Sequence, residues 1–108
     1  MNEIQKYISK NESKMLEDLF SLIRIPSISA KPEHHDDMLA CAERWAQLLI
    51  EAGADEALVM PSKGNPIVFG QKTVDPTAKT VLIYAHYDVM PAEPLELWKL
   101  SLIHISEP

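Results

Sequence analysis

The chain has 108 residues, which is one small domain at most. Its hydrophobic share of 46% is ordinary for a globular protein and argues against disorder, while the net charge of −6 argues against nucleic-acid binding, which needs a basic face. No run approaches the roughly 18 to 20 apolar residues of a membrane span, and the first ten residues lack the apolar core of a signal peptide.

Cys41 is the single cysteine, so an internal disulfide is excluded. Because it falls on the apolar face of a predicted helix, we expect a buried thiol that behaves as a small hydrophobic residue. The single thiol and the lack of a signal peptide together predict a reduced, cytoplasmic setting.

The first predicted element is helical and covers residues 2–25, either as one helix or as two with a weak point at residues 9–13. Pro26 ends it, because the residue before a proline avoids the helical conformation. Apolar residues recur at helical spacing with charged residues between them: Ile4, Ile8, Met15, Leu16, Leu19, Phe20, Leu22 and Ile23.

A loop rich in proline and serine, residues 26–37, leads to a second predicted helix. Asp36 or Asp37 is expected to cap its N-terminus, and Gly53 stands where the glycine after a helix is expected. Trp45 should lie in the core. The apolar face of this helix is formed by Met38, Cys41, Ala42, Trp45, Leu48 and Leu49.

Three short strands are predicted at residues 56–60, 67–71 and 80–85, separated by turn and loop residues. The third, TVLIYA, is continuously apolar, which predicts burial on both faces. Two helices followed by three strands of a mixed sheet indicate an α/β fold that is incomplete at this length.

The third predicted strand runs directly into His86 and Asp88. In open α/β sheets, reactive groups gather beyond the carboxyl ends of strands. A neutral imidazole is a good zinc ligand, and a nearby carboxylate commonly accepts its other ring N–H. Residues two apart on a strand face the same way, so the pair can act together, although H-x-D alone is a weak signal that also fits a surface histidine.

The segments LFSLIRIPSISA and TVLIYAHYDVMPAEPLELWK, taken together, closely resemble the M20 family of zinc metallopeptidases, and in particular its dipeptidase and carnosine-dipeptidase-like branch. The resemblance covers residues 1–99. It implies that His86 ligates one zinc of a two-zinc site and that Asp88 is the catalytic-site carboxylate that orients it. The remaining ligands and the glutamate general base lie further along the family's longer chain.

The resemblance implies a hydrolase that cleaves small peptides with metal-activated water, using two zinc ions about 4 Å apart. The complete enzyme carries an inserted lid or dimerisation domain, which makes a homodimer one expectation. The isolated chain is expected to be inactive, because a catalytic zinc generally needs three protein ligands. Two alternatives stay open: a fragment of an M20-like amidohydrolase that removes acyl groups, or a small non-catalytic α/β binding module.

Residues 100–108, LSLIHISEP, leave the family pattern and resemble the translation of a sequencing adapter. We therefore expect a fragment of a peptidase catalytic domain at residues 1–99 and a non-native tail at residues 100–108, so that His104 is no second ligand. A metal site is not expected at the dense cluster of residues 34–37, nor a serine nucleophile at Ser27 or Ser29. Trp98 should pack in the complete enzyme, and Glu93 and Glu96 are expected to be loop and surface acids.

Overall fold

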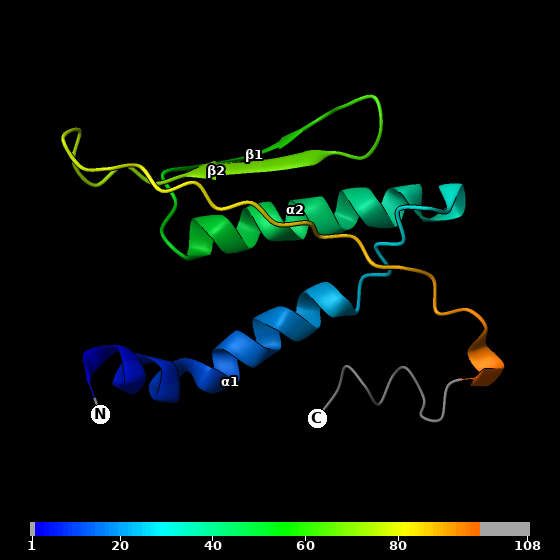
Figure 1. Ribbon diagram of the computed structural model, residues 1–108, viewed down its shortest axis with the longest axis horizontal. Helices are drawn as coiled ribbons and strands as arrows, with labels where there is room; N and C mark the ends of the chain where they lie inside the picture. The colour runs from blue at the N-terminus through cyan, green and yellow to red at the C-terminus, as the bar shows by residue number, and fades with distance from the viewer. Residues whose placement is uncertain (1, 98–108) are drawn as a thin grey trace. The chain divides into compact units, whose positions relative to one another are not determined.

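A computed structural model describes residues 2–97 of the chain (Figure 1). These residues divide into two compact units, and each is described by itself. One contains helix α1 (Glu3–Ile23) and the short 3-10 helix η2 (Leu95–Leu97), and the other is Ile25–Pro91. None of the helices in the described part of the chain combines the length and the apolar character needed to cross a membrane.

Helix α1 is one continuous helix, which settles the choice between one helix and two. The side chain of Asn2 accepts a hydrogen bond from the backbone N of Gln5 at 2.8 Å, and the Gln5 side chain accepts one from the backbone N of Asn2 at 3.0 Å. This reciprocal capping box satisfies amide groups that a helix start leaves unpaired. At the suspected weak point, Asn11 donates to the carbonyl of Tyr7 one turn earlier without breaking the helix.

Helix α2 (His35–Glu51) begins earlier than the sequence predicted. The short 3-10 helix η1 (Pro32–His34) leads into it, and His34 occupies the cap position, so the prediction that Asp36 or Asp37 caps the helix is wrong. Pro32 supplies a backbone angle suited to a first helical turn, so the chain is already helical when it reaches the two acids. They lie in the first turn, where negative charge still suits the positive end of the helix.

The predicted end of α2 is confirmed at Gly53, whose φ angle of 106° lies in the region that favours glycine. The backbone N of Gly53 donates to the carbonyl of Ile50, and the N of Ala54 donates to the carbonyl of Leu49, each at 3.0 Å. These bonds satisfy carbonyls at the helix end and turn the chain toward the first strand.

Strands β1 (Glu56–Met60) and β2 (Ile67–Gln71) have the predicted bounds and pair as an antiparallel hairpin. Glu56 pairs with Gln71 at one end and Met60 with Ile67 at the other. Helix α2 packs against both strands (Figure 1). The approach is close at Gly70, where an added Cβ would lie 2.9 Å from the Leu49 side chain.

The core of the Ile25–Pro91 unit is small and centres on the first half of α2. Its buried apolar residues are Met38, Cys41 and Ala42, so the prediction for Cys41 is confirmed. Trp45 is half-buried rather than fully buried, as are Leu48 and Leu49. The apolar face of α2 is longer than the part that is fully covered, and this explains the difference.

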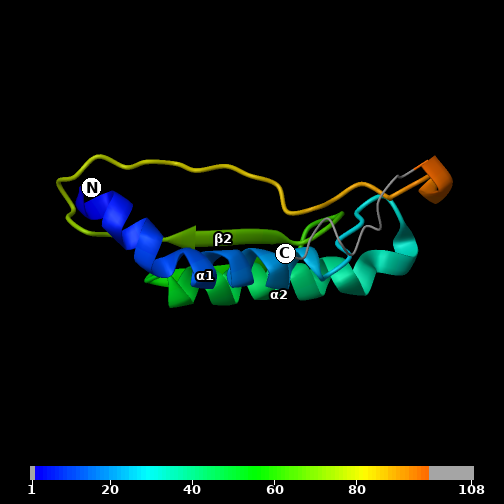
Figure 2. The ribbon, with the colours of Figure 1, turned by 90° about the horizontal axis from the view of Figure 1, so that it is seen from below.

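The third predicted strand does not form in the structure. Residues 80–85 are extended but join neither β1 nor β2, and the sheet within the described residues has two antiparallel strands rather than three in a mixed arrangement. Figure 2 shows this segment running back past β2 without joining it. Its side chains are not buried on both faces: Val81, Leu82, Ile83 and Tyr84 are 82 to 90% exposed. A continuous apolar run becomes a buried strand only where strands and covering layers meet it, and the described residues provide neither.

Candidate functional site

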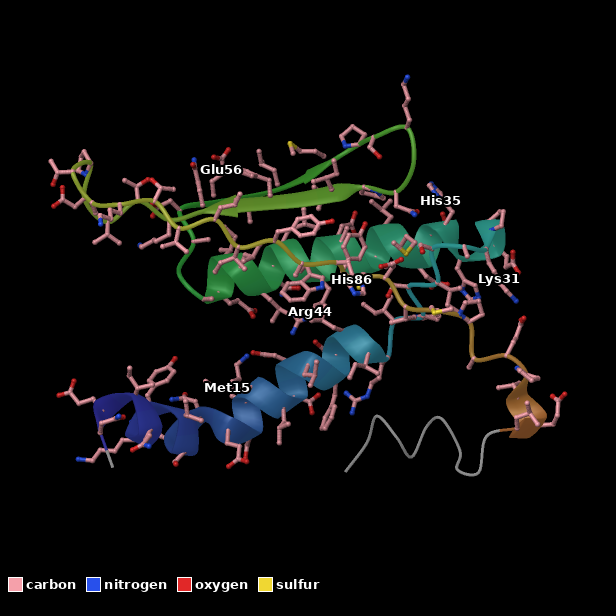
Figure 3. The ribbon with its side chains drawn as sticks, viewed as in Figure 1. Met15, Lys31, His35, Arg44, Glu56 and His86 are labelled. Atoms are coloured by element: carbon pink, nitrogen blue, oxygen red, sulfur yellow. The ribbon has the colours of Figure 1, made fainter. Side chains whose placement is uncertain are left out.

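His86 and Asp88 form a direct side-chain pair at the end of the extended segment. The Nδ1 atom of His86 lies 2.7 Å from Oδ1 of Asp88 and 3.2 Å from the backbone oxygen of the same residue. An ionised carboxylate can only accept a hydrogen bond, so Nδ1 carries a proton, and in the neutral imidazole Nε2 then keeps its lone pair. The imidazole is 80% exposed, and Figure 3 shows it on the segment that passes α2. Nε2 is therefore chemically available to a metal ion.

Asp88 is held on its other side by a serine from a distant part of the sequence. Ser29 Oγ donates to Oδ2 of Asp88 at 2.5 Å, across a separation of 59 residues. The Ser29 hydrogen bond and, after it, the His86 hydrogen bond hold the pKa of Asp88 below its usual value. Both carboxylate oxygens thus have a donor, and the ionised form that orients the histidine is the favoured one.

The loop that carries Ser29 is clipped to the H-x-D segment through the backbone. Ser27 accepts a hydrogen bond from the backbone N of Val89 at 2.8 Å, and Ile28 and Val89 form an isolated parallel bridge. Ser27 is 1% exposed, and its hydroxyl donates to the carbonyl of Tyr87 at 2.9 Å. The clip fixes the position of Ser29 relative to Asp88.

Tyr87 ties the same segment to the helix and the hairpin. Its hydroxyl donates to the carbonyl of Pro66, directly before β2, at 2.5 Å. Its own carbonyl lies 4.0 Å from Sγ of Cys41 on α2. Burial raises the pKa of the Cys41 thiol. Burial, and after it the nearby negative charge, raises the pKa of the Tyr87 phenol. Both groups are therefore held in their neutral forms.

The other cluster of possible ligands forms a local pair. His34 Nδ1 lies 2.8 Å from Oδ2 of Asp37 within one helical turn, while His35 and Asp36 are exposed. In the part of the chain that the structure describes, no group of three histidine, cysteine or acidic side chains is arranged to hold a metal ion. A catalytic zinc takes about three protein ligands. The pair of His86 and Asp88 therefore fits one ligand and its orienting partner, not a complete site.

The structure brings together His86 and Asp88, as the sequence predicted, and adds Ser27 and Ser29, for which the sequence pattern argued only against a role as nucleophiles. The spacing S-x-S at Ser27 and Ser29 matches the spacing H-x-D, and the two stretches meet at the bridge between Ile28 and Val89. That match was a faint signal, because nothing in the sequence shows that the two stretches pair. Glu93 and Glu96 are exposed, as expected, while Trp98 and residues 100–108 lie outside the described residues.

Comparison with known proteins points in one direction. No family model matches the chain. It is 28% identical over 100 residues to the cysteinylglycine-S-conjugate dipeptidase of Corynebacterium striatum, covering 93% of this chain and 22% of that protein. It is 32% identical over 108 residues to the Cys-Gly metallodipeptidase DUG1 of Candida albicans, covering 85% of this chain and 21% of that protein. The chain resembles metallodipeptidases.

A solved structure of the dipeptidase Dug1p from Saccharomyces cerevisiae shares the fold. The TM-score is 0.77 at 24% identity, and the match covers 88% of this chain and 22% of that one. The likeness confirms an α/β fold shared with part of that chain. The chain spans about a fifth of the length of these relatives, as the covered shares of 22% and 21% show.

Proposed function

We propose that the chain is part of the catalytic domain of an M20-type zinc metallodipeptidase, in which His86 ligates zinc through Nε2 and Asp88 orients it. The observation that carries the proposal is the 2.7 Å contact between Nδ1 of His86 and Oδ1 of Asp88. It leaves the second ring nitrogen with a free lone pair on an exposed side chain. The similarity to metallodipeptidases supplies the reaction class.

Zinc would supply Lewis-acid polarisation of the scissile carbonyl and activation of water. The part that falls to this chain is to hold one imidazole in a fixed tautomer and direction. Asp88 does so by accepting from Nδ1, and its ionised state is favoured by the hydroxyl of Ser29. Two zinc ions per site and small peptides as substrates are part of the proposal, and the names of the relatives make Cys-Gly the first dipeptide to test.

The exposed apolar surface favours part of a larger domain over a stand-alone binding module. Four consecutive apolar side chains, Val81 to Tyr84, are almost fully exposed, and the sheet within the described residues has two strands. A closed module would bury such a run, because leaving it in water sacrifices the main driving force for folding. An amidohydrolase of the same fold remains the alternative, and nothing in the described residues favours it.

Two assays test the proposal. In the first, the purified chain with added zinc is given Cys-Gly, and no turnover is expected because one ligand does not make a catalytic site. In the second, the reading frame is extended from its source DNA and the longer product is compared with its His86→Ala variant. We expect the longer product to contain zinc and to hydrolyse Cys-Gly, and we expect its His86→Ala variant to lose both properties. Turnover by the chain alone that disappears in His86→Ala would contradict the inactivity, and full zinc content in the longer His86→Ala product would contradict the ligand role.

A further inference from the structure

Ser29 touches no proposed metal ligand, yet it contacts the residue that orients one. We propose that Ser29 is a positioning residue for the His86 imidazole: its hydroxyl locks the Asp88 carboxylate and thereby fixes the tautomer that leaves Nε2 free. The contacts are 2.5 Å from Ser29 Oγ to Asp88 Oδ2 and 2.7 Å from Asp88 Oδ1 to His86 Nδ1. The three side chains form one hydrogen-bonded row.

The row needs Ser29 because the other two members are open to solvent. The side chain of Asp88 is 39% exposed and that of His86 is 80% exposed. Water competes for both groups, and a carboxylate held by only one neighbour can turn away from it. A second donor on Oδ2 restricts the rotation of the carboxylate and keeps Oδ1 aimed at Nδ1.

Ser29 can restrict Asp88 because its own backbone is held in place. The adjoining Ile28 bridges Val89, and Ser27 is buried with its hydroxyl on the carbonyl of Tyr87. The hydroxyl of Ser29 therefore approaches Asp88 from a loop that is clipped to the backbone on both sides of that residue. This differs from a surface serine that meets an acid by chance, since neither loop can shift without breaking the clip.

The consequence lies in the tautomer of His86. A neutral imidazole free in water favours the proton on Nε2, which would block that nitrogen as a ligand. Asp88 reverses the preference by accepting from Nδ1, and Ser29 maintains Asp88 in the position to do so. The inference rests on the proposed function, because only a metal-ligand role for Nε2 gives this tautomer a purpose.

The test measures the tautomer directly and uses no metal. Nitrogen-15 NMR of the histidine-labelled chain at about pH 8, where imidazoles are neutral, gives the ratio of Nδ1–H to Nε2–H for His86. Ser29→Thr and Ser29→Val are nearly identical in shape, and only the first keeps a hydroxyl. We expect the wild type and Ser29→Thr to hold mainly Nδ1–H, and the ratio to fall by about fivefold or more in Ser29→Val. Ser13→Ala, on exposed α1, is the control and should leave the ratio unchanged.

Three results would overturn the inference. The first is a ratio of Nδ1–H to Nε2–H that does not change in Ser29→Val. The second is an equal fall of this ratio in Ser29→Thr and Ser29→Val, because the hydroxyl would then be irrelevant. Protection of the buried Cys41 thiol from alkylation shows whether the fold survives; if Ser29→Val exposes it, Ser29→Ala, which adds no bulk, decides instead. An unchanged ratio in that variant is the third.

The same experiment separates this inference from the proposed function. Because zinc is absent, a failure here removes the role of Ser29 and leaves the ligand role of His86 standing. The reverse outcome is also distinguishable. If the tautomer depends on Ser29 but added zinc does not bind to Nε2 of His86, the role of Ser29 is supported and the metal-ligand role of His86 is contradicted.

Discussion

Asp88 binds the imidazole of His86, two residues before it, through a 2.7 Å contact at Nδ1. The contact is local in sequence, so it can form as soon as the extended segment places both side chains on one side. What it does not fix is the direction of the carboxylate, which the distant Ser29 supplies. The contact of Asp88 with His86 and the contact of Ser29 with Asp88 together determine which ring nitrogen is free.

Replacing Asp88 with alanine should release His86 from its tautomer. Without the acceptor on Nδ1, the ratio of Nδ1–H to Nε2–H is expected to fall by about tenfold, a larger effect than that of removing Ser29, because Asp88 contacts the ring itself. Nitrogen-15 NMR of the labelled chain measures the ratio. Asp75→Ala is the control, since the side chain of Asp75 accepts hydrogen bonds from Thr77 in its own loop. A ratio that survives Asp88→Ala would mean that the contact does not govern the tautomer.

The end of α2 should depend on the glycine at position 53. Its φ of 106° strains any residue with a side chain, although an added Cβ would meet nothing within 4 Å. Gly53→Ala is therefore expected to cost about 1 to 2 kcal/mol in the free energy of opening of the Ile25–Pro91 unit.

Alkylation of Cys41 measures this opening, because the thiol is 1% exposed and burial raises its pKa. The rate should rise by roughly 5- to 30-fold in Gly53→Ala. Gly64→Ala is a matched control, because Gly64 has no positive φ and an added Cβ would come no closer than 4.0 Å to the Ser62 hydroxyl. Equal rates in the two variants would show that the backbone at Gly53 is not under this constraint.

Asp55 should stabilise the junction between α2 and the hairpin in a pH-dependent way. The hydrogen bond from the backbone N of Thr73 and then that from Lys72 hold the pKa of Asp55 below its usual value. Because the folded-state pKa is lowered, the stabilisation is present above the usual aspartate pKa of about 3.9 and is lost as the pH falls through the lower folded value.

Carbon-13 NMR of the Asp55 carboxyl, with the Thr73 amide resonance as a second probe, should give one shared midpoint below that of an unfolded peptide. Thr73→Pro removes the amide donor and should raise the pKa of Asp55 more than Lys72→Ala does, since the backbone hydrogen bond is the larger cause. The opposite order would contradict this account of the junction.

The exposed extended segment should make the chain self-associate. Val81 and Ile83 are 82% and 86% exposed and lie two apart in a run that joins no strand within the described residues. Such an exposed apolar run is of the kind that recruits other strands. The double variant Val81→Lys/Ile83→Lys should lower the associated fraction in sedimentation velocity by several-fold. Val74→Lys, at an equally exposed loop position, should not. If both variants behave alike, added charge rather than the segment explains the change.

The parts of the fold that depend on residues close together in the sequence could be predicted, and the part that depends on distant residues could not. The hairpin at Glu56–Met60 and Ile67–Gln71 was predicted with its bounds, because turn residues and short apolar runs act locally. Gly53 was placed correctly for the same reason. The prediction of a buried strand at residues 80–85 is wrong, because these side chains are exposed. An apolar composition shows that a segment can be buried, but it does not show that neighbouring strands and helices are present to bury it.

The same distinction between local and long-range contacts applies to the candidate site. The partnership of His86 and Asp88 follows from a spacing of two residues and was predicted. The contact of Ser29 with Asp88 joins positions 59 residues apart and depends on a parallel backbone bridge that no local pattern encodes. Pro32 likewise started a helical turn ahead of Asp36, where the sequence suggested a cap.

The most direct test of the central claim is a zinc titration of the histidine-labelled chain followed by nitrogen-15 NMR. We predict that the Nε2 resonance of His86 moves with added zinc while Nδ1 keeps its proton on Asp88, and that Asp88→Ala weakens this response by about tenfold or more. Zinc that leaves His86 Nε2 unmoved, or that displaces the proton from Nδ1 instead, would contradict the claim that this imidazole is built to hold a metal ion.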